Sequence, residues 1–227
     1  MKKIVLITGG SDGLGKEIAR VLNNDFLVII LADKEDKLKK TAKELGVDYF
    51  VCDVSSYKNC EEVINKIIQK YKKIDCLINN AGIWIEGFLE ENDFEKIKKA
   101  VEINLLGSIY LTKLVVPLMK KQKSGDLIFI NSQAGLNAKA KRAVYTATKW
   151  GLNGFAKSLQ QELLPFNIRV LNFYPGKMKT FLFEKAGIEK DLSNAFEPKY
   201  LAKLTKEVLL LPKEIVVSEF GIKSLKQ

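Results

Sequence analysis

The chain has 227 residues, 47% of them hydrophobic, and a formal net charge of +10. That length can bury one sizeable core, and no Pro/Gly-rich or low-complexity stretch marks a boundary, so we expect one domain over residues 1–227. The positive charge is almost all lysine mixed with acids, as in KEDKLKKTAKE (34–44), which is typical of solvated helices and argues against specific nucleic-acid binding. No apolar run approaches the length of a signal sequence or a membrane span, which requires about 20 residues.

The cysteines predict no disulfide framework and no metal site. Cys52, Cys60 and Cys76 are odd in number and widely spaced, and the chain has no histidine to complete a zinc site. We therefore expect reduced, core-packing thiols in a cytoplasmic protein.

Short apolar runs alternate with amphipathic stretches along the chain. The expected strands are 4–8, 26–31, 48–53, 76–80, 126–131 and 168–174, and the expected helices are 13–24, 34–45, 57–72, 92–122 and 144–164. Runs that are apolar at every position suit strands covered on both faces, as in a parallel sheet. The pattern predicts an α/β fold, a single doubly wound Rossmann-type domain with a mostly parallel sheet flanked by helices. Ligands of such sheets bind at the carboxyl ends of the strands, so binding motifs are expected just after each strand.

A glycine-rich turn follows the first expected strand. TGGSDGLGKEIA (8–19) places Gly9, Gly13 and Gly15 before an apolar helical repeat. Glycines permit a tight turn and close approach of a pyrophosphate, and the following helix offers backbone N–H groups and partial positive charge. This context favours nucleotide binding over an ordinary glycine loop.

With this turn the sequence resembles the short-chain dehydrogenase/reductase family, and further motifs match the family in order over about residues 4–180. They are CDV (52–54), NNAG (79–82), the asparagine of NLLG (104–107), the serine of NSQAG (131–135), YTATK (145–149) and PGKMKT (175–180). The resemblance implies a dinucleotide site formed by Gly9, Ser11, Asp12, Gly13, Leu14, Gly15, Asp33, Asp53, Val54, Asn80, Ala81, Gly82, Tyr145, Lys149, Pro175, Gly176, Met178 and Thr180. It implies a catalytic tetrad of Asn104, Ser132, Tyr145 and Lys149.

Taken alone, Tyr145 and Lys149 carry little weight, because chance produces about one such spacing in a chain this rich in lysine. Their chemistry is nevertheless suitable. Reduction of a carbonyl needs a proton donor at the oxygen, and a lysine one helical turn away favours the phenolate and lowers the pKa of the tyrosine. The resemblance implies that Ser132 orients the substrate oxygen and that Asn104 holds a water leading to Lys149. Without the resemblance, Ser132 would be interpreted as a serine of a turn and Asn104 as an ordinary residue of a helix interior.

The cofactor is expected to be NAD or NADP, with NAD favoured. Asp33, at the end of the second strand, can accept hydrogen bonds from ribose hydroxyls and repel a 2′-phosphate. Asp12 stands where the family's NADP-using members often carry a basic residue, which also favours NAD. Lys34, next to Asp33, argues in the opposite direction because it can turn toward a phosphate.

The substrate is a small-molecule carbonyl or alcohol of unknown identity. The resemblance implies that the segment 177–204 covers it, and an apolar pocket is expected from Met178, Phe181, Leu182 and Phe183 with Ile83, Trp84 and Leu136.

The tail EIVVSEFGIKSLKQ lacks the family's usual glycine pair, which weakens the expectation of a homotetramer; a homodimer at least is expected. Two alternatives stay open, a 3-oxoacyl-thioester (acyl-carrier-protein) ketoreductase and a non-catalytic nucleotide-sensing regulator.

Overall fold

A computed structural model describes residues 2–226, and its centre is one sheet of parallel strands in the order β3-β2-β1-β4-β5-β6-β7. The strands are β1 (Ile4–Thr8), β2 (Leu27–Ala32), β3 (Asp48–Val51), β4 (Cys76–Asn79), β5 (Gly125–Ile130), β6 (Ile168–Pro175) and β7 (Glu219–Ile222). The sequence order reverses between β1 and β4, so the switch point of this doubly wound sheet lies there.

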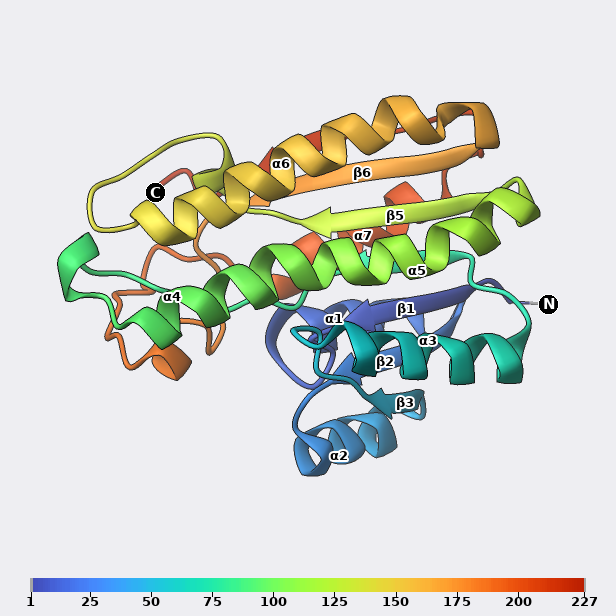
Figure 1. The fold of residues 1–227 in the computed structure, drawn as a ribbon, viewed down its shortest axis with the longest axis horizontal. Helices are drawn as coiled ribbons and strands as arrows, with labels where there is room; N and C mark the ends of the chain where they lie inside the picture. The colour runs from blue at the N-terminus through green and yellow to red at the C-terminus, as the bar shows by residue number, and fades with distance from the viewer. Residues whose placement is uncertain (1, 227) are drawn as a thin grey trace.

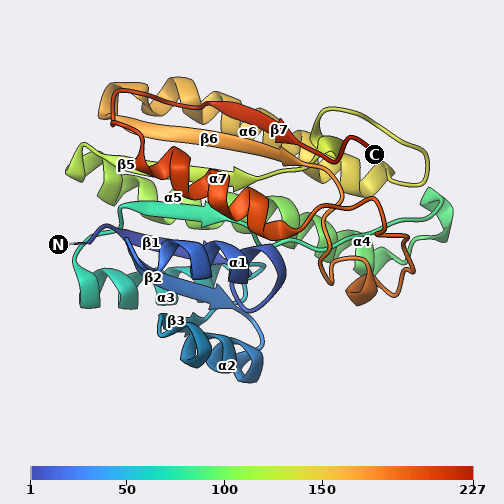
Figure 2. The same cartoon turned by 180° about the vertical axis from the view of Figure 1, so that it is seen from behind.

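Helices cover both faces of the sheet. They are α1 (Gly13–Leu22), α2 (Glu35–Leu45), α3 (Tyr57–Tyr71), α4 (Phe94–Val101), α5 (Gly107–Gln122), α6 (Ala143–Leu163) and α7 (Pro198–Leu210). Helices α3, α5 and α6 lie on one face (Figure 1), and α1, α2 and α7 lie on the other (Figure 2). The expected layers and the Rossmann-type fold are confirmed.

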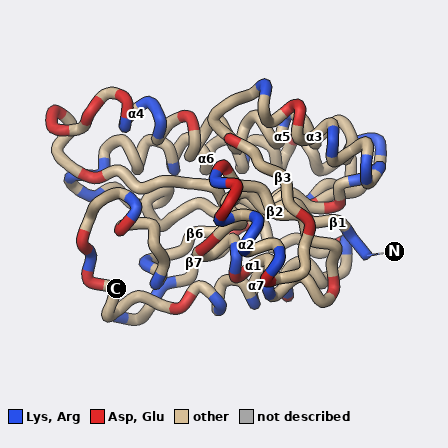
Figure 3. Tube along the Cα trace, turned by 90° about the horizontal axis from the view of Figure 1, so that it is seen from below, with Lys and Arg blue, Asp and Glu red and all other residues tan. Residues whose placement is uncertain are grey.

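Each strand is apolar at successive positions because its side chains enter two cores in turn. Leu6 packs with residues of α3, α5 and α6, whereas Val5 and Ile7 pack with residues of α1, α2 and α7. All five side chains of β1 are buried. Acidic and basic residues are interspersed over the outer surface of the helices (Figure 3), as expected for solvated faces.

Two elements near the C-terminus differ from the sequence expectations. Strand β7 was not predicted, because Glu219–Ile222 is a half-exposed edge strand that lacks the continuous apolar pattern of the others. The segment 177–204, expected to cover the substrate, is not irregular throughout: its last residues form the start of α7, which packs against α1. Only residues 177–197 extend beyond the carboxyl ends of the strands as an irregular covering segment, which contains the short helix η5 (Glu184–Ala186).

The expected helix 92–122 is continuous over Phe94–Gln122, with a π-helical turn, η2 (Glu102–Leu106), between α4 and α5. By length and composition this helix could cross a membrane, contrary to the expectation drawn from the apolar runs. In this fold it packs against β4, β5, α3 and α6. The π turn carries Asn104 and places it in the interior.

Candidate active site

A cleft of about 1180 Å³ opens at the carboxyl ends of the strands and collects nearly all the predicted site residues. Its lining includes Gly9, Ser11, Asp12, Gly13, Leu14, Asp33, Asp53, Val54, Asn80, Ala81, Gly82, Ser132, Tyr145, Lys149, Pro175, Gly176, Met178 and Thr180. Of the predicted residues, Gly15 and Asn104 do not line the cleft and lie behind its wall.

The glycine-rich turn between β1 and α1 is too compact for side chains. Gly9 has φ +63° and Gly13 has φ +51°, in the left-handed region that glycine adopts readily. A Cβ on Gly15 would stand 2.3 Å from the carbonyl oxygen of Gly9. Glycine at these positions keeps the turn folded tightly against the start of α1.

Asp12 precedes the first turn of α1, but its side chain does not cap the helix. Its carboxylate instead forms ion pairs with Lys37 of α2 and Lys185 of the covering segment. Burial opposes ionisation, yet the hydrogen bonds from Lys185 and Lys37 prevail and lower the pKa of Asp12. The backbone N–H groups at the start of α1 therefore have no side-chain cap and can receive an anion.

The NNAG motif is hydrogen-bonded to the end of β1. The Thr8 hydroxyl accepts hydrogen bonds from the backbone N–H groups of Asn80 and Ala81, each at 2.9 Å. Asn80 Nδ2 donates to the carbonyl oxygen of Thr8 at 2.8 Å. These bonds join β1 to β4 at the switch point and fix the floor of the cleft.

Together these features fit a dinucleotide. The uncapped helix start and the glycine turn suit a pyrophosphate, and Asp33 lies beyond them at the end of β2. Asp53 and Val54 line the cleft after β3, and the residues after β6 line it beside the glycine turn, where Thr180 Cβ would lie 3.6 Å from a Cβ on Gly13. The cleft thus continues from the first three strands, across the switch point, to Tyr145.

Tyr145 and Lys149 lie one turn apart in α6, and each is only 5% exposed. Lys149 Nζ lies 5.9 Å from the centroid of the Tyr145 ring and donates a hydrogen bond to the carbonyl oxygen of Ile130 at 3.0 Å. Gly82 is close by, since a Cβ there would approach Lys149 Nζ at 4.0 Å. Helical spacing thus brings both side chains to one wall of the cleft.

The electrostatics of this pair differ from the sequence expectation. Burial raises the pKa of Tyr145 to about 12, although the Ser132 hydroxyl and the charge of Arg142 act in the opposite direction. Burial also lowers the pKa of Lys149 to about 8. Desolvation therefore outweighs the Ser132 hydrogen bond and the Arg142 charge, and the phenol is protonated at neutral pH.

Ser132 and Asn104 occupy different positions relative to Tyr145. Ser132 follows β5, lines the cleft, and its hydroxyl accepts a hydrogen bond from the N–H of Ala134 at 3.1 Å. Asn104 is fully buried, where its side-chain oxygen accepts from the N–H of Ile83 at 2.7 Å and its Nδ2 donates to the carbonyl oxygen of Ile83 at 3.0 Å. Ser132 is thus placed to touch a ligand, whereas Asn104 ties the π turn to the chain after β4.

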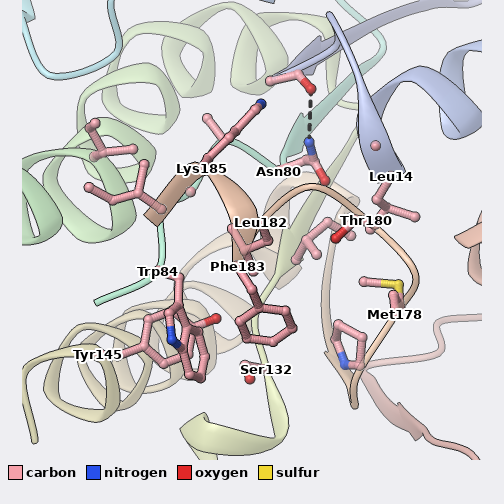
Figure 4. A pocket seen from close by; sticks show the side chains of 18 of the residues that line it. Leu14, Asn80, Trp84, Ser132, Tyr145, Met178, Thr180, Leu182, Phe183 and Lys185 are labelled. Atoms are coloured by element: carbon pink, nitrogen blue, oxygen red, sulfur yellow. Dashed lines mark hydrogen bonds between the residues drawn. The ribbon is translucent and has the colours of Figure 1, made fainter. Parts of the chain in front are cut away.

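An aromatic wall closes the cleft beside Tyr145 (Figure 4). The Trp84 ring lies 4.3 Å from that of Tyr145 and 4.8 Å from that of Phe183, measured between centroids. Ile83, Met178 and Leu182 also line the cleft, as expected. Leu136 does not line it and is exposed, and Phe181 lines it with a side chain that is 52% exposed. Fewer of the expected apolar side chains therefore form the wall of the substrate pocket.

The sequence reading missed the basic residues of this end, chiefly Lys139, Arg142 and Lys190, all of which line the cleft. A signal was available for Arg142, which is one of three arginines in the chain and stands three residues before Tyr145. Lys139 and Lys190 gave no such signal, because lysine is abundant throughout the sequence. The three cysteines are buried free thiols, and Cys52 borders the cleft.

Comparisons with known proteins agree with this site. The family model for short chain dehydrogenases matches residues 3–191. An uncharacterized oxidoreductase of Staphylococcus saprophyticus is 32% identical over 99% of this chain and 97% of its own length. A 3-oxoacyl-[acyl-carrier-protein] reductase of Thermotoga maritima is 35% identical over 81% of this chain and 77% of its own.

A solved structure extends the likeness over the whole fold. The alcohol dehydrogenase of Thermococcus sibiricus, complexed with 5-hydroxy-NADP, superposes with a TM-score of 0.91 and 29% identity over 99% of this chain and 97% of its own. The matching fold, the family model and the cleft lead to one conclusion. The chain belongs to the short-chain dehydrogenase family and is an NAD(P)-dependent oxidoreductase.

Proposed function

We propose that the cleft interconverts a ketone and a secondary alcohol, with Tyr145 as the proton donor in reduction and the acceptor in oxidation. The observation that carries this proposal is the position of the Tyr145 phenol beside the Ser132 hydroxyl, in the same cleft that the glycine turn lines. Reduction adds one hydride to the carbonyl carbon and one proton to its oxygen. A bound nicotinamide dinucleotide supplies the hydride when reduced and accepts one when oxidised.

The protein's own residues would orient and protonate the substrate. Ser132 would donate a hydrogen bond to the carbonyl oxygen, and Tyr145, protonated at neutral pH, would deliver its proton to that oxygen. Lys149 would stabilise the negative charge that develops on the phenol. Asn104 would act by positioning, through its two hydrogen bonds to Ile83, rather than by touching the substrate.

The test is oxidation of NADH and NADPH, followed at 340 nm, with a panel of free ketones, and the reverse reaction with the matching alcohols. We expect turnover with at least one ketone and loss of that turnover in Ser132→Ala. A protein that binds the dinucleotide but turns over no member of the panel would instead support the nucleotide-sensing regulator.

For the cofactor we propose a preference for NAD, carried by the Asp33 carboxylate at the end of β2, whose side chain is 57% exposed. A negative charge there would repel a 2′-phosphate. The adjacent Lys34, which pairs with Asp33 at 3.7 Å, and the NADP-type ligand of the Thermococcus sibiricus enzyme argue against it. The test is the ratio of kcat/KM with NADH to kcat/KM with NADPH. A ratio below one would refute the preference for NAD.

A second candidate is reduction of 3-oxoacyl thioesters on an acidic carrier protein. The Thermotoga maritima relative carries that activity in its name, and the basic lining of this cleft would suit an acidic partner. Comparing an acyl-carrier-protein thioester with the same acyl group on a short thiol separates the two: only a carrier-dependent enzyme should strongly prefer the former. A homodimer and a cytoplasmic location remain predictions.

A further inference from the structure

Charged side chains are unevenly distributed along the cleft. Its three acidic lining residues, Asp12, Asp33 and Asp53, all belong to the end formed by the chain after β1, β2 and β3. The wall around Tyr145 is lined by cations without a lining acid. Near Tyr145 these cations are Lys149, Arg142 and Lys190, and Lys139 also lines the cleft.

Arg142 is the best-placed of these cations. It immediately precedes α6, and its Cζ lies 5.1 Å from the centroid of the Trp84 ring, so the guanidinium stacks on the aromatic wall. Its side chain is 27% exposed, and its Nε is buried without a hydrogen bond to any residue in 2–226. The exposed part of this planar guanidinium, held against a ring at the edge of the cleft, suits a carboxylate.

The protein neutralises only part of this charge. Glu86 Oε1 lies 2.9 Å from Lys190 Nζ and 3.7 Å from Arg142 Nε, so one carboxylate oxygen faces two cations. The other oxygen, Oε2, accepts a hydrogen bond from Trp84 Nε1 at 2.9 Å. Glu86 does not line the cleft, whereas both cations do. Together with Glu86, one more negative charge on a ligand in the cleft would balance the two positive charges of Lys190 and Arg142.

We infer that the substrate carries a carboxylate, which binds Arg142 with support from Lys190 and Lys139, while its carbonyl lies at Tyr145 and Ser132. This inference rests on the proposed function and specifies its substrate class. Arg142 Cζ and the Tyr145 ring both pack against Trp84, at 5.1 and 4.3 Å from its ring centroid. A substrate that reaches both groups would have several bonds between its carboxylate and its reacting carbon, with an apolar middle against Trp84 and Phe183.

The probes are three methyl ketone acids of increasing length, 4-oxopentanoate, 5-oxohexanoate and 7-oxooctanoate, each compared with its neutral primary amide. For the best-fitting length, kcat/KM of the acid should exceed that of the amide by about 10- to 100-fold, as expected for a hydrogen-bonded charged pair. The excess should fall as ionic strength rises. A ratio near one at every length overturns the inference.

Variants assign the effect to residues. Arg142→Gln should bring the acid-to-amide ratio close to one, and Arg142→Lys should retain part of it because the charge remains. Lys139→Gln, in an exposed loop and therefore tolerant of change, should lower the ratio severalfold and serves if Arg142→Gln does not fold. Lys66→Gln, an exposed lysine of α3 outside the cleft, is the charge-matched control and should leave the ratio unchanged.

The two proposals fail differently. If neutral ketones are reduced without preference for acids, or if Arg142→Gln keeps the full ratio, the anionic substrate class is wrong and the oxidoreductase function stands. If neither acids, amides nor the wider ketone panel is turned over with either cofactor, the proposed function itself is wrong. Inhibition gives a second readout. Hexanoate and hexanamide carry no ketone to reduce, and hexanoate should inhibit the turnover of a ketone more strongly than hexanamide does.

Discussion

The two ends of the cleft are built in different ways. The end formed by β1, β2 and β3 depends on backbone geometry: glycines at positive φ, an uncapped helix start, and a hydrogen bond from the N–H of Asn80 to the Thr8 hydroxyl. At the Tyr145 end the surface is made of side chains, with stacked rings and a group of cations. A backbone surface depends on where glycine stands, whereas a side-chain surface can be changed residue by residue.

The largest expected effect lies at the Tyr145 end. Tyr145→Phe removes the proton donor and should lower kcat by about 10²- to 10⁴-fold, the usual contribution of a general acid. Binding of the dinucleotide should still raise Tm, because the glycine turn is untouched. Steady-state kinetics and a thermal-shift titration measure the two effects. Near-normal turnover in this variant would contradict the role assigned to the phenol.

The next effect concerns stability at the same end. Lys149 has a folded-state pKa of about 8 against an ordinary 10.5, so its buried charge destabilises the native state below pH 8. Lys149→Met should therefore raise the free energy of unfolding at pH 7 by about 3 kcal/mol. Between pH 8 and 10.5 the wild-type protein regains this stability, since its native state releases a proton that the unfolded chain keeps. Urea unfolding across that range should show the difference shrinking, and a constant difference would contradict the burial argument.

A smaller effect is expected at the glycine turn. Gly15→Ala places a Cβ 2.3 Å from the Gly9 carbonyl oxygen, and such overpacking costs about 1 to 3 kcal/mol. Gly154→Ala is the matched control, because a Cβ at this site in α6 meets nothing within 4 Å. The control should be neutral or stabilising by up to about 1 kcal/mol. Urea unfolding compares them, and equal behaviour of the two variants would mean that the turn tolerates a side chain.

The smallest effect is expected at the exposed carboxylate of Asp33. Asp33→Asn should shift the NADH-to-NADPH ratio of kcat/KM severalfold toward NADPH, a modest change because exposed charges are screened by solvent. Asp36→Asn, a neighbouring exposed acid in the first turn of α2, is the control. An unchanged ratio in Asp33→Asn would remove this residue from cofactor selection.

The sequence predicted the backbone-built end more fully than the other. Glycine spacing and continuous apolar runs have local causes, so the turn and the layers could be predicted from the sequence. The pKa of Tyr145 could not, because it depends on how Trp84 and Phe183 bury the phenol, and these residues come from distant segments. Arg142 was overlooked for a similar reason: its meaning depends on Glu86 and Trp84, which lie more than 50 positions away in the sequence.

The β1–β4 pair has a consequence for how the chain folds. Val5 pairs with Cys76 and Ile7 with Ile78, so the centre of the sheet joins segments about seventy positions apart. Such non-local pairing is slow to form, because the loop entropy is lost before the contacts are gained. The Thr8 hydrogen bonds to Asn80 and Ala81 span the same distance and complete the floor of the cleft. The complete cleft therefore forms only after β1 and β4 have paired. A segment of the chain that lacks either strand cannot form it.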